Sequence, residues 1–353
     1  MRILIIKPSS LGDIFHVFPA IALLRRQYPD AIIDWLVHPS FADALDYCPG
    51  GVDRKIFFHR RHLGRLSSFV PTAWRLLGEL RRYKYDLIFD FQGLLRSALC
   101  GFAARGRQTV GWAAPREPAA SRFYRHRIAA SHAGHALEKN LDLVRTFCQL
   151  DPGAAAACPV PVQPDHRRKM LEKLKRLQIE PADRLIGVVP GARWSSKQFP
   201  AELFAQILKA IRAKDGEVKF LMLGSNDDMP AVQAIREHCD DPLLCSLVGC
   251  THIGEMIEAV RCCDLLLSGD TGPIHLAAAM EIPVFALFGS TDPVKTGPYG
   301  DIHHVYQAPL DCVKCMRRRC PHQMLPACHQ LDAPRIAADM LTVLAEIPPH
   351  DSI

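Results

Sequence analysis

The most informative absence in this 353-residue sequence is that of a long hydrophobic run. No segment approaches the ~18 consecutive apolar residues of a membrane-spanning helix, which excludes such a span. The apolar stretch at 1–6 is followed at once by Lys7-Pro8 and lacks the cleavage region of a signal peptide, so it predicts a buried first strand. We therefore expect the protein to stay in the cytoplasm.

A strong excess of charge of either sign is also missing. The net charge is only +6, and apolar and charged residues make up 48% and 23% of the chain, as in soluble globular proteins. This modest positive balance suits an acidic ligand or a membrane surface, but it is too weak to indicate a nucleic acid as a partner. The length allows two domains, each with its own core.

Cysteine, in contrast, is plentiful, with thirteen residues. In a long chain without an export signal most of them are expected to be reduced core thiols. Four lie within 17 residues, and the pair Cys-x2-Cys is a usual opening of a structural zinc site, although the other spacings match no standard finger. Structural zinc, a redox-labile disulfide and plain packing remain open. The four are Cys312, Cys315, Cys320 and Cys328, with His322 and His329 interspersed.

Apolar runs that fit buried parallel strands alternate with helical patterns along the first half of the chain. Strands covered on both faces are continuously apolar and β-branched. The predicted strands are 2–7, 31–37 and 86–91, and a helix is predicted at 14–28. Strand, turn and helix in this order are typical of a doubly wound α/β domain.

The alternation stops near Leu150 and then begins again. Residues 151–164 contain four prolines and little periodicity, which indicates a linker. The second half predicts strands at 184–189, 218–223, 264–268 and 283–288, and helices at 199–213 and 333–347. The predicted divisions are an α/β domain at 1–158, a second at 159–332 that includes the cysteine-rich segment 312–328, and a helix with a tail at 333–353.

The turn after the first predicted strand, Ser9-Ser10-Leu11-Gly12-Asp13, places a carboxylate at the end of that strand. Gly12 would allow a tight turn, and Asp13 would face a ligand cleft and could act as a general base. Position alone favours a simpler role, because aspartate is a common N-cap and a helix is predicted to begin at Ile14. Both roles remain open at this point.

Two further strand-to-helix turns carry residues suited to a phosphate group. In the turn 269–273, Gly-Asp-Thr-Gly-Pro, two glycines allow close approach of a ligand and the helix N-terminus attracts an anion. The turn 191–200 contains Arg193 and Lys197, and a lysine there could neutralise phosphate. Helix capping in the first turn and solvated surface charge in the second are the alternative interpretations.

Together these motifs resemble those of the ADP-heptose:lipopolysaccharide heptosyltransferases, glycosyltransferase family 9. The segments that carry the resemblance follow in the same order along nearly the whole chain: 7–14 (Lys-Pro-Ser-Ser-Leu-Gly-Asp-Ile), 196–200 (Ser-Lys-Gln-Phe-Pro), 269–276 (Gly-Asp-Thr-Gly-Pro-Ile-His-Leu) and 288–293 (Phe-Gly-Ser-Thr-Asp-Pro). Within the family the chain looks nearest to heptosyltransferase I, on the residues Arg60-Arg61, Gln92-Gly-Leu, Arg116-Glu-Pro and 121–124.

The resemblance implies an α/β protein of the GT-B fold, with two Rossmann-like doubly wound domains facing across a cleft. It also implies inverting transfer of L-glycero-D-manno-heptose from ADP-heptose to Kdo of the lipopolysaccharide inner core, with Asp13 as the catalytic base. The residues that the resemblance assigns to the donor are Arg193, Lys197, Gly224, Asp270, Thr271, Gly272 and His275. Those assigned to the acceptor are Ser10, Gly12, Arg60, Arg61, Gln92 and Arg116.

No Asp-x-Asp triplet occurs in the sequence, although metal-dependent sugar transferases commonly use one. This agrees with a mechanism that requires no metal cofactor, in which Lys197 and a helix dipole supply the positive charge. Zinc at the four cysteines would then be structural. The implied partners are ADP-heptose, a Kdo–lipid A or lipopolysaccharide core acceptor and, at the periphery, the inner face of the inner membrane.

Three alternatives remain. The cysteine-rich segment looks more like that of heptosyltransferase II, so the acceptor could be a later core sugar. A GT-B-like nucleotide-sugar epimerase would need no acceptor, and a zinc-stapled interaction protein would have no activity.

The apolar residues of 74–80 have helical spacing and are interpreted as ordinary packing.

Overall fold

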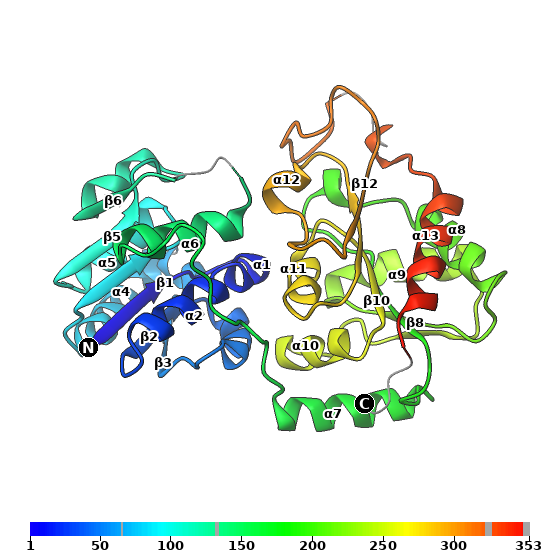
Figure 1. The fold of residues 1–353 in the computed structure, drawn as a ribbon, viewed down its shortest axis with the longest axis horizontal. Coiled ribbons are helices and arrows are strands. Elements are labelled where there is room, and N and C mark those ends of the chain that lie inside the picture. Colours follow the sequence, from blue (N-terminus) through cyan, green and yellow to red (C-terminus); the bar gives the residue numbers. More distant parts are fainter. Residues whose placement is uncertain (65, 131–133, 322–326, 349–353) are drawn as a thin grey trace. The chain divides into compact units, whose positions relative to one another are not determined.

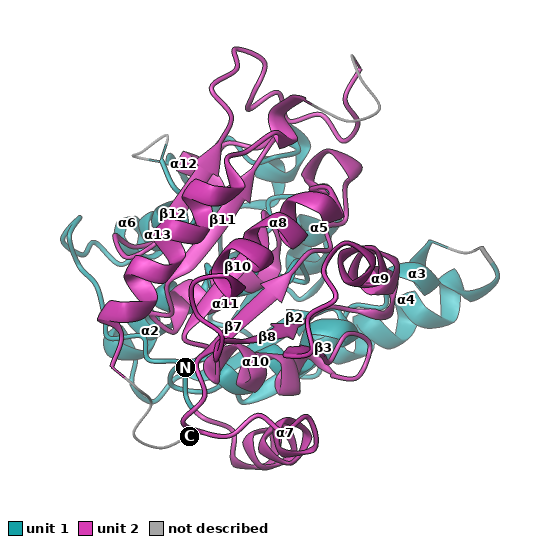
Figure 2. Cartoon of the chain, turned by 90° about the vertical axis from the view of Figure 1, so that its right-hand side faces the viewer, with its two compact units in different colours: residues 1–161 teal, residues 162–353 magenta. Residues whose placement is uncertain are grey.

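The computed structural model describes residues 1–64, 66–130, 134–321 and 327–348. The chain forms two compact units, Met1–Pro161 and Val162–Ile353, which are coloured separately in Figure 2. The boundary lies within the proline-rich segment 151–164. No helix among the described residues is long and apolar enough to cross a membrane.

The first unit contains a six-stranded, wholly parallel sheet in the order β3-β2-β1-β4-β5-β6 (Figure 1). Its strands are β1 Arg2–Ile6, β2 Ile32–Val37, β3 Arg54–Phe57, β4 Leu87–Asp90, β5 Gln108–Trp112 and β6 His126–Ile128. Its helices are α1 Leu11–Phe15, α2 Phe18–Gln27, α3 Arg60–Leu63, α4 Leu66–Arg81, α5 Leu95–Ala103 and α6 Ala136–Phe147, with 3-10 turns at Pro39–Tyr47 and Pro118–Phe123.

The second unit repeats this topology, with parallel strands in the order β12-β11-β10-β7-β8-β9. Its strands are β7 Leu185–Val189, β8 Lys219–Met222, β9 Leu244–Ser246, β10 Leu265–Gly269, β11 Val284–Phe288 and β12 His304–Gln307. Its helices are α7 Pro164–Arg176, α8 Ala201–Arg212, α9 Met229–His238, α10 Ile253–Arg261, α11 Gly272–Ala279, α12 Pro293–Thr296 and α13 Ala333–Glu346, with 3-10 turns at Ser195–Lys197, Asn226–Asp228 and Ala327–His329.

The central strands of both sheets are buried along their length apart from Arg2 at the start of β1, as their apolar sequences predict. In each unit the two middle strands continue into opposite halves of the sheet, which creates a topological switch point between them. Register aligns these ends: Ile6 at the end of β1 lies beside Asp90 at the end of β4, and Val189 of β7 lies beside Ser268 of β10. The turns that follow two paired strands therefore begin side by side at the same edge of the sheet.

The doubly wound α/β class is confirmed, but local predictions differ in two respects. The helix predicted at 14–28 is two helices, α1 and α2, and α1 already begins at Leu11. The helix predicted as a separate C-terminal element, α13, packs on α8 and contributes Ile336 and Met340 to the core of the second unit. Its apolar face is buried there because a helix of this length is not stable alone in water.

Candidate functional site

The candidate site of the first unit is the turn between β1 and α1, where Asp13 occupies the third position of the helix. Both the backbone N–H and the hydroxyl of Ser10 donate to Asp13 Oδ2, over 2.9 and 2.6 Å. Asp13 thus supports the start of the helix from within it, with Ser10 as the N-cap, so the predicted N-cap role before Ile14 is wrong. The prediction that Gly12 forms a tight turn is wrong too, because Gly12 lies buried inside α1.

Asp13 is paired with a cation from the end of the same strand. Lys7 Nζ lies 3.6 Å from Asp13 Oδ1, and the Lys7 side chain is 8% exposed whereas that of Asp13 is 45% exposed. Lys7 Nζ also donates to the Phe91 carbonyl over 3.0 Å, beyond the end of β4. One buried ammonium group thereby joins both strands of the switch point to a carboxylate that reaches solvent.

This pairing sets the protonation state of Asp13. Desolvation acts to raise the pKa of the carboxyl, but the charge of Lys7 and the two hydrogen bonds from Ser10 outweigh it, and the pKa lies well below its usual range. The carboxylate is therefore ionised at neutral pH. Its position at the strand ends and its partial exposure suit a general base that accepts a proton from a bound hydroxyl.

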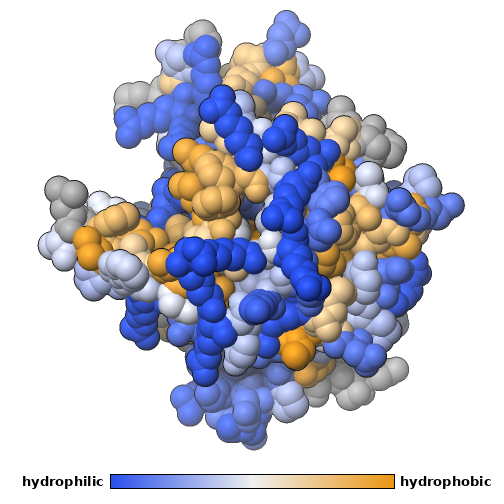
Figure 3. Space-filling view, turned by 90° about the vertical axis from the view of Figure 1, so that its left-hand side faces the viewer, coloured by the Kyte–Doolittle hydropathy of each residue, from blue (hydrophilic) through white to orange (hydrophobic). Residues whose placement is uncertain are grey.

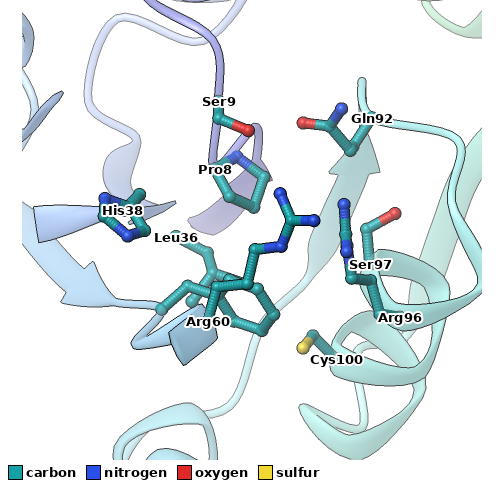
Figure 4. A pocket seen from close by; sticks show the side chains of 10 residues that line it. Pro8, Ser9, Leu36, His38, Arg60, Gln92, Arg96, Ser97 and Cys100 are labelled. Atoms are coloured by element: carbon teal, nitrogen blue, oxygen red, sulfur yellow. The ribbon is translucent and has the colours of Figure 1, made fainter. Parts of the chain in front are cut away.

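A polar pocket lies next to this turn in the first unit. Figure 4 shows Arg60 and Arg96 side by side, with the Gln92 amide near Arg96 and the Ser9 side chain across the pocket. The buried Gln92 Oε1 accepts no hydrogen bond from any residue that the structure describes. A donor from a ligand, such as a sugar hydroxyl, would satisfy it.

The charges around the pocket are mostly of one sign. Burial lowers the pKa of Arg96, and the neighbouring Arg60 and Arg116 lower it further, against the opposing effect of Glu117. Burial likewise lowers the pKa of His38, and the electrostatic effect of His59, Arg61 and Arg60 lowers it further. None of the four arginines forms an ion pair within the described part of the chain. Unpaired guanidinium groups that repel one another suit an anion with several negative charges.

A buried carboxylate holds the far wall of this pocket in place. Asp90 accepts hydrogen bonds from the Tyr124 and Ser97 hydroxyls, over 2.7 and 2.8 Å, and from the Gln92 and Gly93 N–H groups, over 2.8 and 3.2 Å. Burial nevertheless raises the pKa of Asp90. The network fixes the turn that carries Gln92 and the start of α5, which carries Arg96.

Gly93 brings Arg116 into this arrangement. Its φ of +65° is in the left-handed region, and a side chain there would meet the Arg116 backbone N at 3.4 Å and Pro115 at 3.3 Å. The Gly93 carbonyl also accepts the Glu117 N–H over 3.1 Å. Only glycine meets both requirements without strain.

The second unit has a candidate site of its own, which contains a lysine held by a buried carboxylate. Lys197 Nζ lies 2.6 Å from Asp270 Oδ2, which also accepts the Thr291 hydroxyl over 2.6 Å. The ammonium group lies 4.9 Å from the centre of the Trp194 ring. Asp270 is only 6% exposed, and its buried carboxylate holds the Lys197 ammonium group in position.

The helix that follows β10 begins beside this pair. Thr271 is the N-cap of α11, Gly272 is its first residue and His275 lies in its first turn. The N–H groups of such a first turn have no acceptor within the helix, and the helix dipole favours an anion there. Arg193 is exposed in the Lys197 turn and forms no ion pair with a described residue. Lysine, arginine and helix N-terminus together suit a diphosphate.

The Lys197 turn is held in place by segments distant in sequence. The Ser196 hydroxyl donates to the Arg317 carbonyl over 2.6 Å, the Ser196 N–H donates to the Arg318 carbonyl, and the Ser196 carbonyl lies 3.0 Å from His329 Nε2. Glycines end the strands beneath it: a side chain at Gly269 would meet the Lys197 carbonyl at 3.1 Å.

Gly224 has a structural explanation of a different kind. A side chain at Gly224 would meet the Asp228 carboxylate at 2.7 Å, and one at Gly191 would overlap the same group. The Asp228 carboxylate in turn accepts the Ser225 N–H over 2.7 Å. Packing around Asp228 therefore accounts for Gly224, and its assignment to a donor stays a prediction.

The four clustered cysteines line one cavity of about 240 Å³, together with Ser196 and Ser290. Burial and the three other thiols of the cluster raise the pKa of Cys328. All thirteen cysteines are free, so the disulfide alternative is not what the structure contains. Among the described residues no three side chains of a ligating type are grouped closely enough to hold a metal ion. Zinc here stays a prediction, and His322 lies outside the described residues.

Comparison with known proteins identifies the family. The family model described as glycosyltransferase family 9 (heptosyltransferase) matches residues 73–325, more than half of the chain. The chain belongs to glycosyltransferase family 9. The predicted family is therefore confirmed, and with it glycosyltransferase activity.

Relatives of this family 9 member extend over most of its length. It is 28% identical over 334 residues to lipopolysaccharide heptosyltransferase 1 of Pseudomonas aeruginosa, which covers 92% of this chain and 88% of the relative. It is 26% identical over 312 residues to lipooligosaccharide heptosyltransferase 2 of Haemophilus influenzae, covering 85% and 87%. The solved structure of E. coli heptosyltransferase WaaC with ADP is similar at a TM-score of 0.78 and 22% identity, covering 97% and 100%, which shows the GT-B fold.

The sequence alone did not predict Lys7, Asp90 and Arg96 as candidate site residues of this family 9 enzyme. Lys7 was noticed only as part of a motif, and Asp90 and Arg96 were not singled out. A lysine at the end of an otherwise apolar strand is the one local signal that marks Lys7. Asp90 ends a similar strand, but its partner Tyr124 lies 34 residues further along, so only the fold joins them.

Replacing Lys7 by methionine tests how Asp13 is kept ionised. The change removes the ammonium group but keeps a side chain of similar length. Desolvation then acts without the opposing charge, so we expect the pKa of Asp13 to rise by about 1–3, the usual effect of one nearby opposite charge. A carbon-13 NMR titration of the Asp13 carboxyl measures the change, and Lys7→Arg is the matched control that retains the charge. An unchanged titration in Lys7→Met would show that Lys7 does not set this pKa.

Proposed function

We propose that this family 9 enzyme transfers L-glycero-D-manno-heptose from ADP-heptose to Kdo of the lipopolysaccharide inner core, with inversion at the anomeric carbon. The observation that carries the proposal is Asp13, a half-exposed carboxylate held ionised in a turn whose Ser9 lines a pocket with Arg60 and Arg96. The lipopolysaccharide heptosyltransferases to which the chain is similar supply the sugar and the class of acceptor.

In the proposed reaction an acceptor hydroxyl attacks the anomeric carbon while Asp13 takes its proton. The new bond forms opposite the bond to the diphosphate, which breaks and releases ADP with the bonding electrons, so the configuration inverts. Because the pKa of Asp13 lies below its ordinary range, the base is unprotonated down to a pH of about 4. A weak but fully ionised base suits a step in which the sugar carbon becomes strongly electrophilic.

The donor is proposed to bind through the second unit. Lys197 and the first turn of α11 would stabilise the negative charge that develops on the departing diphosphate. Asp270 is a positioning residue in this scheme, since its buried carboxylate holds the lysine through a 2.6 Å contact. With this charge provided by the chain, we propose that transfer requires no metal ion.

The acceptor is proposed to bind through the first unit. Kdo carries a carboxylate, and Arg60, Arg96 and Arg116 form a cluster of cations that make no ion pair with a described residue, although Glu117 lies near Arg96. Gln92 would accept a hydrogen bond from a sugar hydroxyl. Because the acceptor is anchored in a lipid layer, the enzyme would work at the cytoplasmic side of the inner membrane and contact it at the periphery.

Transfer to a later core sugar, as by a heptosyltransferase II, is the second candidate. The family relatives include both types, at 28% and 26% identity. An anionic, lipid-linked acceptor is common to the two.

Mass spectrometry of the product separates these candidates. We expect incubation with ADP-heptose and Kdo2–lipid A to add one heptose to the acceptor and to release ADP. An unchanged acceptor mass would contradict the proposal, and transfer only to an acceptor that already carries one heptose would favour the second candidate. Incubation of ADP-heptose alone is the control, since an epimerase would convert the sugar nucleotide without any acceptor.

Asp13→Ala tests the base. We expect the transfer rate with saturating substrates to fall by about 10²- to 10⁴-fold, the usual contribution of a positioned general base. Asp13→Asn should be as slow, although its amide oxygen can still accept the Ser10 N–H and support α1. Circular dichroism and ADP titration should show both variants folded and able to bind the nucleotide. Near-normal turnover in either variant would exclude Asp13 as the base.

Lys197→Met tests the donor half of the site. We expect the affinity for ADP to fall by about 10- to 100-fold, as when one hydrogen bond to a charged group is lost. Isothermal titration calorimetry measures it, and Lys169→Met, which removes an exposed lysine of α7, is the matched control for net charge. Equal affinity in the two variants would show that Lys197 does not contact the diphosphate.

A further inference from the structure

The first unit contains an open groove of about 550 Å³ between α4 and α5, closed at one end by α3. Its lining is mostly apolar and includes Leu63, Phe69, Ala73, Leu76 and Leu99. This volume lies in the ordinary range for sites that bind small molecules. Figure 3 shows apolar surface on this side of the unit, interrupted by strongly hydrophilic side chains.

Nothing in the described chain covers the apolar face of this groove. Phe69 is 48% exposed and Leu99 is 44% exposed. The sequence predicted ordinary packing for 74–80. Leu80 is in the core and Leu76 packs against it, but both also line the groove, together with Leu77. Contiguous exposed apolar surface of this kind usually marks a binding site.

The groove and the polar pocket beside Ser9 share part of their lining. The residues that line both are Phe58, Arg60, Arg96 and Cys100. Two of these are members of the unpaired arginine cluster, so positive charge lies where the apolar groove meets the polar pocket. A molecule that occupies both must carry anionic groups directly next to an apolar chain.

We propose that this groove binds one acyl chain of the lipid-linked acceptor while an anionic group of the acceptor contacts Arg60 and Arg96, which line both the groove and the polar pocket. The inference rests on the proposed function, which supplies the lipid-linked acceptor. Charge complementarity selects this occupant, since the cations lie only at the end shared with the polar pocket. Binding would withdraw a chain from the lipid layer and so direct the sugar toward Asp13.

The test compares two acceptors, Kdo2–lipid A in detergent and the same molecule with its acyl chains removed. Ala73→Trp fills the groove without changing charge. Thr72→Trp is the matched control, because it places the same bulk on α4 outside the groove lining. Trp74→Ala removes an exposed aromatic side chain, 69% exposed and also outside the lining, that a bilayer surface would contact.

We expect Ala73→Trp to lower kcat/KM for the acylated acceptor by at least about tenfold, the effect of excluding only two methylene groups from the groove. With the deacylated acceptor it should equal the wild type, and Thr72→Trp should equal the wild type with both. A second readout requires no transfer: the fluorescence of cis-parinaric acid should rise on binding to the wild type and to Thr72→Trp, but not to Ala73→Trp.

Several results would overturn the proposal. One is that the ratio of kcat/KM for the acylated acceptor to kcat/KM for the deacylated acceptor is the same in Ala73→Trp as in the wild type. Another is that the wild type fails to bind cis-parinaric acid. Loss of activity on acceptor vesicles in Trp74→Ala alone would indicate a bilayer contact instead. A dimer that light scattering detects in the wild type, and that Ala73→Trp dissociates, would assign the groove to a second copy of the chain.

Failure of the proposed function gives a different pattern. In that case neither acceptor gains a heptose from the wild type, and the fatty acid titration still decides whether the groove binds an acyl chain. If the deacylated acceptor is heptosylated and Ala73→Trp acts on both acceptors as the wild type does, the function stands and the groove proposal alone fails.

Discussion

A parallel sheet covered by helices on both faces meets water only at the ends of its strands, and this constraint determines where polar chemistry can be placed in both units. Side chains along β1, β7 and β10 are buried, so a charged group among them would lose its hydration without a partner. The turns after the strands have no such limit. Since the switch points open between β1 and β4 and between β7 and β10, the candidate residues of each unit gather there.

Each unit contains an ion pair with one more exposed and one buried member, and the signs of the two members are reversed between the units. In the first unit the more exposed member of the pair is an anion, Asp13, and its buried partner is Lys7. In the second the more exposed member is a cation, Lys197, and its buried partner is Asp270. The buried ion is satisfied by a further contact in each case, the Phe91 carbonyl for Lys7 and the Thr291 hydroxyl for Asp270. In each pair the more exposed group is therefore held in place by its buried partner before any ligand arrives.

The sequence was sufficient to predict what local patterns encode. Central strands such as 184–189 and 283–288 are apolar except for Arg184, and the observed β7 and β11 differ from them by one residue at the start. The strands missed were β3, β5, β6, β9 and β12, which are short or carry charged and polar residues because most lie at sheet edges. Lys197 and Asp270 were predicted as separate candidates, but their pairing depends on two strands being neighbours. The groove was missed because helical spacing at 74–80 shows that a helix has an apolar face without showing what covers it.

The contacts that hold the Lys197 turn are made largely to main-chain carbonyls, those of Arg317 and Arg318. A carbonyl is present at every position of a chain, so the side chains of this segment can be exchanged without removing the support. Its length is constrained instead, because one inserted residue would move each carbonyl away from its donor. Point substitutions can therefore alter the surface of the segment while Lys197 stays in place, whereas insertions and deletions here would displace it.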